Sequence, residues 1–209
     1  MRRWALTGPS GAGKSAVGAL LAARGAAILD GDALGHEVLA RPGIAAAIGR
    51  AFGPEVLSGG AVDRSRLGPL VFADPAALAR LDALVHPTLA RLMQERLDVL
   101  AAAGEHALAV LEAAVYFLLP TPPPVDLVVA VDAPAALRAR RLAAARGLDE
   151  AAAAARIAAQ ASWDALWSRA DRIIVNDGTP ADLARAVDAL WRDHGPARRA
   201  PSPQGDPQS

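Results

Sequence analysis

Residues 4–15 read Trp4-Ala5-Leu6-Thr7-Gly8-Pro9-Ser10-Gly11-Ala12-Gly13-Lys14-Ser15, and they decide the fold of the chain. The first four predict a short buried strand, and an apolar helix is predicted from Lys14 to about Arg24. Between them, Gly8 to Ser15 fits G-x-x-x-x-G-K-[ST], whose glycines let successive backbone N–H groups converge on phosphate oxygens at a helix N-terminus. The sequence therefore predicts a loop that binds the phosphates of a nucleoside triphosphate.

This motif assigns chemistry to individual residues. Lys14 is expected to reach the β- and γ-phosphates, and the Ser15 hydroxyl to ligate Mg²⁺. Lys14 is the only lysine in the chain, which excludes the guanine-reading N-K-x-D motif of a GTPase. The residues expected to hold the nucleotide are Gly8, Pro9, Ser10, Gly11, Ala12, Gly13, Lys14, Ser15 and Ala16.

Composition limits the remaining classes of protein. The 209 residues are 53% hydrophobic, which suits one domain with a buried core. The 22 basic and 22 acidic residues balance, so nucleic acid is not an expected partner. Without cysteine there are no disulfides or thiolate metal sites, and without a long apolar run there is no membrane span. We expect a cytoplasmic monomer.

The order of elements predicts an α/β protein of the P-loop NTPase fold, with a five-stranded, mostly parallel sheet flanked by helices. After the first strand, strands are predicted at 26–29, 106–111, 125–131 and 172–175, and helices at 134–145, 148–168 and 180–192. Residues 33–104 have a helical pattern with no evident strand. Breaks are predicted at Arg41-Pro42-Gly43, Ser58-Gly59-Gly60 and His86-Pro87. The predicted parts are a nucleotide-binding core (1–32, 105–135 and 170–195), a helical acceptor-binding insertion (33–104), a lid (136–169) and a disordered tail (196–209).

Asp30-Gly31-Asp32 follows the second predicted strand. If that strand lies close to the first, its carboxyl end faces the same phosphates. A carboxylate there can accept the proton of an acceptor hydroxyl and orient its oxygen toward the γ-phosphorus. Alternatively, either Asp30 or Asp32 caps the next helix.

An arginine-rich helix follows the strand at 125–131. Its guanidinium groups suit a lid that closes over a triphosphate and neutralises charge. They also suit a solvated basic face that pairs with Asp149 and Glu150. The residues concerned are Arg138, Arg140, Arg141 and Arg146.

Further motifs follow the phosphate loop in a distinctive order. They are Leu29-Asp30-Gly31-Asp32 with Leu34-Gly35-His36-Glu37-Val38, then Phe52-Gly53, Val62-Asp63-Arg64-Ser65-Arg66-Leu67 with Val71-Phe72, His86-Pro87, Arg156 with Gln160, and Ala170-Asp171 with Asn176. A phosphate loop alone is generic, but this series resembles the dephospho-coenzyme A kinase family over roughly residues 4 to 192.

The resemblance implies an activity and site residues. Members of this family transfer phosphate from ATP to the ribose 3′-hydroxyl of dephospho-coenzyme A, the final step of coenzyme A synthesis. Asp32 then corresponds to the catalytic base and Arg141 to the lid arginine, while Lys14 and Mg²⁺ neutralise charge. Asn176 is expected near the adenine, and Arg64 and His86 at the acceptor site.

The chain departs from the family pattern in a few places. Leu118 stands where the family has an acid, Arg138 replaces a glutamine of the lid, and Arg146 falls one place late. Another small-molecule P-loop kinase is therefore one alternative. A nucleotide-binding regulatory module without turnover is the other.

Overall fold

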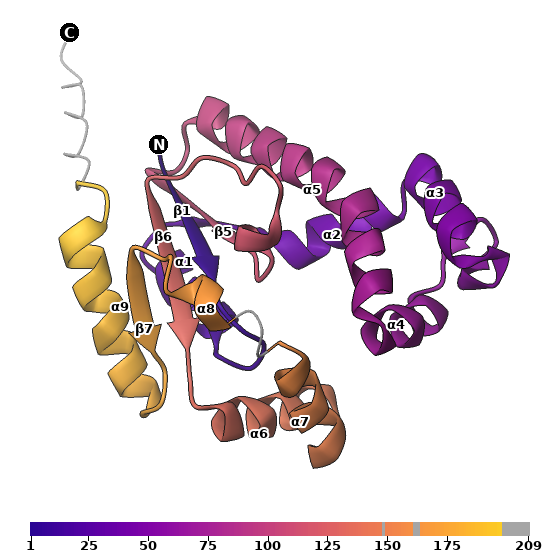
Figure 1. The fold of residues 1–209 in the computed structure, drawn as a ribbon. Helices are drawn as coiled ribbons and strands as arrows, with labels where there is room; N and C mark the ends of the chain where they lie inside the picture. The colour runs from indigo at the N-terminus through magenta and orange to yellow at the C-terminus, as the bar shows by residue number, and fades with distance from the viewer. Residues whose placement is uncertain (148, 161–163, 198–209) are drawn as a thin grey trace, which may run out of the picture.

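The computed structural model describes residues 1–147, 149–160 and 164–197. Its centre is a five-stranded sheet in the order β2-β5-β1-β6-β7, in which every neighbouring pair is parallel (Figure 1). This confirms the predicted α/β sheet. The strands are β1 (Arg2–Thr7), β2 (Ala27–Asp30), β5 (Leu108–Glu112), β6 (Leu127–Asp132) and β7 (Arg172–Val175).

The strand order corrects one expectation. The second strand does not lie next to the first, because β5 is placed between β2 and β1. Glu112 at the end of β5 pairs with Leu6 of β1 on one side and with Asp30 of β2 on the other. Glu112 therefore ends the strand that lies between β1 and β2, and Asp30 lies one strand further from β1.

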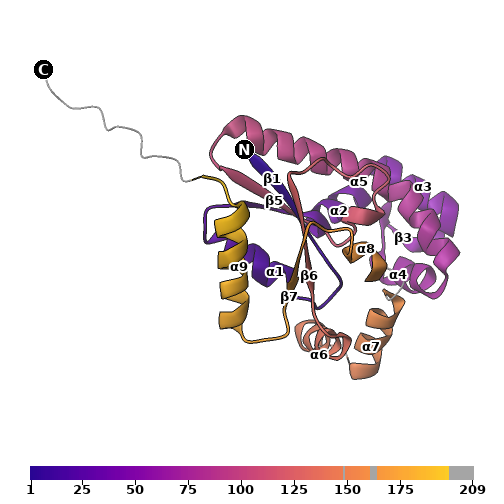
Figure 2. The same cartoon turned by 60° about the vertical axis from the view of Figure 1, so that its left-hand side comes forward.

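Helices cover both faces of the sheet (Figure 2). Trp4 and Leu6 of β1 pack on one side with α1 (Lys14–Ala22) and α9 (Pro180–His194), whereas Ala5 packs on the other with α2 (Gly31–Leu39) and α5 (Pro75–Ala103). This alternation follows the period of two along a strand. All three side chains are at most 1% exposed, so β1 is held firmly where it enters the phosphate loop.

The insertion between β2 and β5 contains α2, α3 (Pro42–Phe52), α4 (Arg64–Ala73) and α5. It also contains a short antiparallel hairpin, β3 (Leu57–Ser58) and β4 (Ala61–Val62), so the expectation of no strand there was wrong. Two-residue strands are too short to show a periodic pattern. The predicted break at His86-Pro87 was also wrong, since the 29-residue helix α5 continues through it.

Two further helices, α6 (Ala135–Arg146) and α7 (Glu150–Ala159), lie beyond the carboxyl ends of the strands in both views (Figures 1 and 2). They pack on each other through Leu142, Ala153 and Ile157. The single helix predicted over 148–168 is divided into α7 and α8 (Asp164–Trp167), with residues 161–163 outside the described residues.

Two further predictions concern the tail of the chain and the absence of a membrane-spanning helix. The predicted tail at 196–209 lies outside the described residues from 198 onward. Within residues 1–147, 149–160 and 164–197, no helix has both the length and the apolar character that crossing a membrane requires.

Candidate active site

The loop between β1 and α1 depends on its glycines. Gly8, Gly11 and Gly13 have φ angles of 130°, 75° and 102°, which favour glycine. A Cβ atom at Gly8 would lie 2.1 Å from the carbonyl oxygen of Val131, and one at Gly11 would lie 2.4 Å from that of Arg138. Gly13 is the N-cap of α1 and has no side chain with which to cap it, so the first N–H groups of the helix suit an anion.

Lys14 and Ser15 begin α1 and point to different partners. The Lys14 Nζ donates to the carbonyl oxygens of Gly8, at 3.1 Å, and Pro9, at 3.2 Å, so the ammonium group is held against the loop. The Ser15 Oγ donates to the Glu112 Oε1 at 2.8 Å. A hydroxyl and a carboxylate thus lie side by side at the start of the helix, and Mg²⁺ prefers oxygen ligands of this kind.

Glu112 is a candidate functional residue that was not predicted. Burial raises the pKa of its carboxyl group, and the charges of Asp30 and Asp32 add to that increase. The hydrogen bond from Ser15 and the charge of Lys14 act in the opposite direction. Glu112 therefore lies within electrostatic reach of both the phosphate loop and the Asp-Gly-Asp motif.

A signal for Glu112 was present in the sequence, because an acid closes the apolar run of β5. Asp132 closes the apolar run of β6 in the same way. In the structure the Asp132 Oδ1 accepts from the N–H of Ala133 at 2.8 Å. Both β5 and β6 pair with β1, but β5 also pairs with β2 whereas β6 also pairs with β7, so Glu112 rather than Asp132 lies beside the Asp-Gly-Asp motif. The sequence does not show this order of strands.

The two aspartates of the Asp-Gly-Asp motif have different tasks. Asp30 is the N-cap of α2, and its Oδ1 accepts from the N–H groups of Asp32, at 2.9 Å, and Ala33, at 3.1 Å. Gly31 is tightly enclosed, since a Cβ atom there would lie 2.7 Å from the carbonyl oxygen of Glu112. The Asp32 carboxylate is exposed on the first turn of α2, which leaves it accessible to an acceptor.

Asn176, expected near the adenine, is 7% exposed and contacts the phosphate loop. Its Nδ2 donates to the carbonyl oxygen of Ala12 at 2.8 Å, and its backbone N–H to that of Asp132 at 2.7 Å. A Cβ atom at Gly13 would lie 2.2 Å from the same Nδ2. The end of β7 is therefore fixed to the phosphate loop, and contact of this region with the adenine stays a prediction.

The arginines of α6 differ in their surroundings. The Nη1 of Arg141 donates to the carbonyl oxygen of Asn176 at 2.9 Å, which leaves further N–H groups of the guanidinium for another acceptor. Arg138 is buried at 6% exposure, whereas Arg140 is exposed. The side chain of Arg146 lies outside the described residues. A solvated basic face therefore describes Arg140 but not Arg138.

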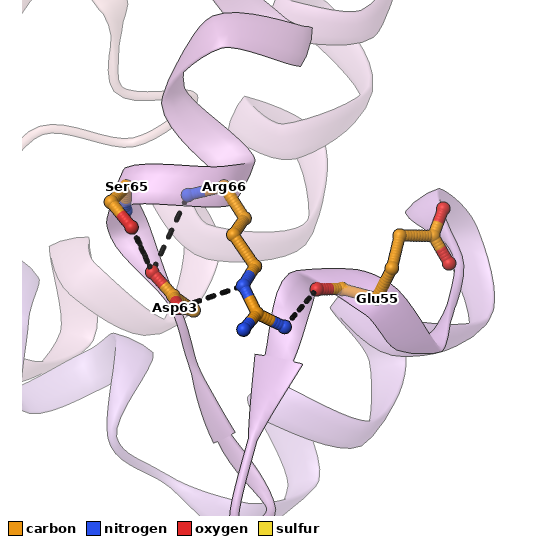
Figure 3. Close-up of polar contacts among 4 residues, drawn as sticks. All are labelled: Glu55, Asp63, Ser65 and Arg66. Atoms are coloured by element: carbon orange, nitrogen blue, oxygen red, sulfur yellow. Dashed lines mark hydrogen bonds and ion pairs between the residues drawn. The ribbon is translucent and has the colours of Figure 1, made fainter.

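The Asp-Arg motif of the insertion shapes the start of α4 (Figure 3). Asp63 is the N-cap, and its Oδ1 accepts from the N–H of Ser65 at 2.9 Å. The Nε of Arg66 lies 3.1 Å from the Asp63 Oδ2, and its Nη1 donates to the carbonyl oxygen of Glu55 at 3.1 Å. Arg64, the predicted acceptor-binding residue, is exposed on the first turn of α4.

His86 lies in the middle of α5. The residue is 7% exposed, and its Nε2 is 3.3 Å from the Oδ1 of Asp82 one turn earlier. Burial raises the pKa of Asp82, while the neighbouring His86 acts to lower it. His86 thus contributes to packing inside the insertion, and its predicted role toward the acceptor stays a prediction.

Comparison with known proteins agrees with this geometry. The family model described as dephospho-CoA kinase matches residues 4–182. Dephospho-CoA kinases of Leifsonia xyli subsp. xyli and Anaeromyxobacter dehalogenans are each 42% identical to this chain, over 89% and 97% of it and over 95% and 97% of those proteins. The crystal structure of TT1252 from Thermus thermophilus has a TM-score of 0.73 at 36% identity and covers 92% of this chain and 97% of that chain. This chain, with its phosphate loop, Asp-Gly-Asp turn and helical insertion, therefore belongs to the dephospho-CoA kinase family, a family of phosphotransferases.

Proposed function

We propose that the protein transfers the γ-phosphoryl group of ATP to the ribose 3′-hydroxyl of dephospho-coenzyme A. The observation that carries this proposal, beside family membership, is the placement of Asp32 within electrostatic reach of Glu112, which in turn accepts a hydrogen bond from Ser15 of the phosphate loop. Asp32, the carboxylate proposed to act on the acceptor hydroxyl, and the phosphate loop both lie at the carboxyl ends of the strands, where α/β proteins bind ligands.

The phosphate loop would hold the triphosphate. The N-terminus of α1 would face the phosphates, and Lys14 would exchange its bonds to Gly8 and Pro9 for phosphate oxygens. In-line transfer requires positioning and charge neutralisation more than covalent chemistry from the protein. Lys14 would supply positive charge from the loop, and Arg141 from α6.

The donor set beside the loop fits Mg²⁺. The Ser15 hydroxyl and the Glu112 carboxylate are both oxygen donors, and they lie 2.8 Å apart. Ser15 and Glu112 would hold Mg²⁺ there, and the bound ion would supply positive charge against the phosphates. Glu112 would hold the ion directly or through water, and Ser15 would be its ligand from the loop.

Asp32 and Arg64 would serve the acceptor. The exposed Asp32 carboxylate would accept the proton of the 3′-hydroxyl while that oxygen attacks the γ-phosphorus. Arg64 lies on the first turn of α4, where the helix dipole disfavours a positive charge. An arginine there does not help the helix, which supports a role in binding the phosphates of dephospho-coenzyme A.

Glu112→Gln is expected to reduce activity about 10- to 100-fold, the usual cost of losing an outer partner of a metal site. The concentration of Mg²⁺ for half-maximal activity should rise. A Mg²⁺ titration of ADP release measures both effects, with Glu105→Gln, an exposed residue in the segment before β5, as the matched control. An unchanged Mg²⁺ requirement would contradict this role.

The same substitution is expected to raise the melting temperature at neutral pH. Since burial raises the folded-state pKa of Glu112, the ionised carboxylate lowers stability at pH values above the ordinary pKa of a glutamate. The gain should disappear below that pKa, where the carboxyl is protonated in both the folded and the unfolded chain. Thermal unfolding across this pH range measures the difference.

Arg141→Ala is expected to lower kcat about 10- to 100-fold, because it removes a positive charge aimed at the transferring phosphoryl group. Affinity for ATP should also fall, since Arg141 fixes Asn176 against the loop. Arg140→Ala, one position earlier and exposed, should change kcat less than twofold. A larger effect of Arg140→Ala would place the functional arginine on another face of α6.

The proposed function is tested by ADP release with ATP, Mg²⁺ and dephospho-coenzyme A, beside shikimate, adenosine and CMP as acceptors. Turnover with dephospho-coenzyme A alone, giving a product with the mass of coenzyme A, is the expected result. Turnover with another acceptor would indicate a different small-molecule kinase. Binding of ATP without any transfer would indicate a regulatory module. The monomeric state and the cytoplasmic location stay predictions.

A further inference from the structure

A contact between distant parts of the chain joins α7 to the phosphate loop. Gln160, the C-cap of α7, accepts a hydrogen bond at its Oε1 from the backbone N–H of Ser10 at 3.0 Å. Its Nε2 donates to the Ser10 Oγ at 3.1 Å. The carboxamide therefore uses both of its ends on a single residue of the loop.

Helix α6, which packs on α7, also contacts the loop, at Gly11. A Cβ atom at Gly11 would lie 2.4 Å from the carbonyl oxygen of Arg138 in α6. Since α6 and α7 pack on each other through Leu142, Ala153 and Ile157, we treat the two helices as one packed unit. Gln160, at the end of α7, thus supplies a polar contact between that unit and the loop.

We propose that Gln160 is a positioning residue for phosphoryl transfer: its carboxamide ties α7 to Ser10 and so fixes the separation between the phosphate loop and the arginines of α6. This inference rests on the proposed function, because those arginines act on the phosphates of ATP. Ser10 is the residue at which the tie meets the loop, and its backbone N–H is directed to Gln160.

Two consequences distinguish positioning from simple packing. The loop presents its N–H groups to phosphate only if the peptide planes on either side of Ser10 are fixed, so loss of the tie should weaken ATP binding. The guanidinium of Arg141, on the same unit, should lose its alignment with the transferring group, so kcat should fall as well. Neither change concerns the acceptor, so the KM for dephospho-coenzyme A should stay constant.

The test is a double-mutant cycle on the full chain with Ser10→Ala, Gln160→Ala and the double variant. Ser10→Ala removes the hydroxyl and keeps the backbone bond, so kcat/KM for ATP should fall about threefold; Gln160→Ala removes both bonds, for a fall of about tenfold. The double variant should have the same kcat/KM for ATP as Gln160→Ala, because the Ser10 hydroxyl has already lost its carboxamide partner in that variant. Gln94→Ala, which removes a carboxamide bonded to Asp98 on α5, is the matched control and should leave ATP kinetics unchanged.

The affinity for ATP, measured by calorimetry without any acceptor, keeps this inference separate from the proposed function. Weaker ATP binding in Gln160→Ala supports the tie even if dephospho-coenzyme A is not the acceptor. Independent, multiplicative effects of the two substitutions would overturn the proposal. It would also be overturned if Gln160→Ala lowered the melting temperature and left kcat and the affinity for ATP unchanged, because that result indicates packing alone.

Discussion

Lys14→Ala is expected to lower kcat by about 10²- to 10³-fold and to weaken ATP binding. The charge lost is held directly against the loop, and removing a single group that stabilises transition-state charge has effects of this size in other enzymes. The structure adds a second cost, because the Lys14 Nζ also bonds the carbonyl oxygens of Gly8 and Pro9. The loop of the variant should therefore be both less charged and less ordered.

Lys14→Arg is the informative companion of this variant. It keeps the positive charge but replaces a compact ammonium group by a planar guanidinium, which cannot take the same position over the loop. ATP binding should recover in part, whereas kcat should stay low. ADP release and calorimetric ATP binding measure the two effects. Near-normal activity of Lys14→Ala would contradict the assignment of residues 8–15 as the triphosphate site.

Asp32→Asn is expected to lower kcat about 10²-fold or more, the usual effect of losing an acid–base group, and to leave ATP binding largely intact. The asparagine has nearly the shape of the aspartate but cannot take the proton of the 3′-hydroxyl. Because Asp32 is exposed on the first turn of α2, the change should have little effect on the fold. Steady-state kinetics with dephospho-coenzyme A as the varied substrate provides the measurement.

Asp30→Asn is the matched control, and the structure explains why. Asp30 caps α2 through the N–H groups of Asp32 and Ala33, and asparagine is as good an N-cap as aspartate. Activity should therefore remain within a few-fold of the unmodified protein. If Asp30→Asn had the larger effect on kcat, Asp30 would be the base, and Asp32 would be a residue of the helix surface.

The parts of the site that were predictable from sequence are those encoded over short distances. The phosphate loop follows from glycines at 8, 11 and 13, because their conformation and close contacts exclude other residues. The sequence left both aspartates of the Asp-Gly-Asp motif open as caps, and the structure assigns the cap to Asp30. Such features depend on neighbours a few residues away.

The features that were missed depend on contacts between distant segments. Glu112 gains its importance from the placement of β5 between β1 and β2, and strand order is not written in any local pattern. The break predicted at Pro87 failed for a related reason. Proline removes one helical hydrogen bond, but α5 is held by the packing of Val85, His86 and Leu89 in the insertion.

The central position of β1 also dictates how the chain must fold. Arg2 pairs with Leu108 and Trp4 pairs with Leu127, so both neighbours of the first strand come from the second half of the chain. During synthesis from the N-terminus, the first strand has no partner until most of the chain has left the ribosome. Pairings of such long sequence separation form slowly. The ability to bind ATP should therefore arise late in synthesis. ATP binding by stalled nascent chains of increasing length would measure the length at which it begins.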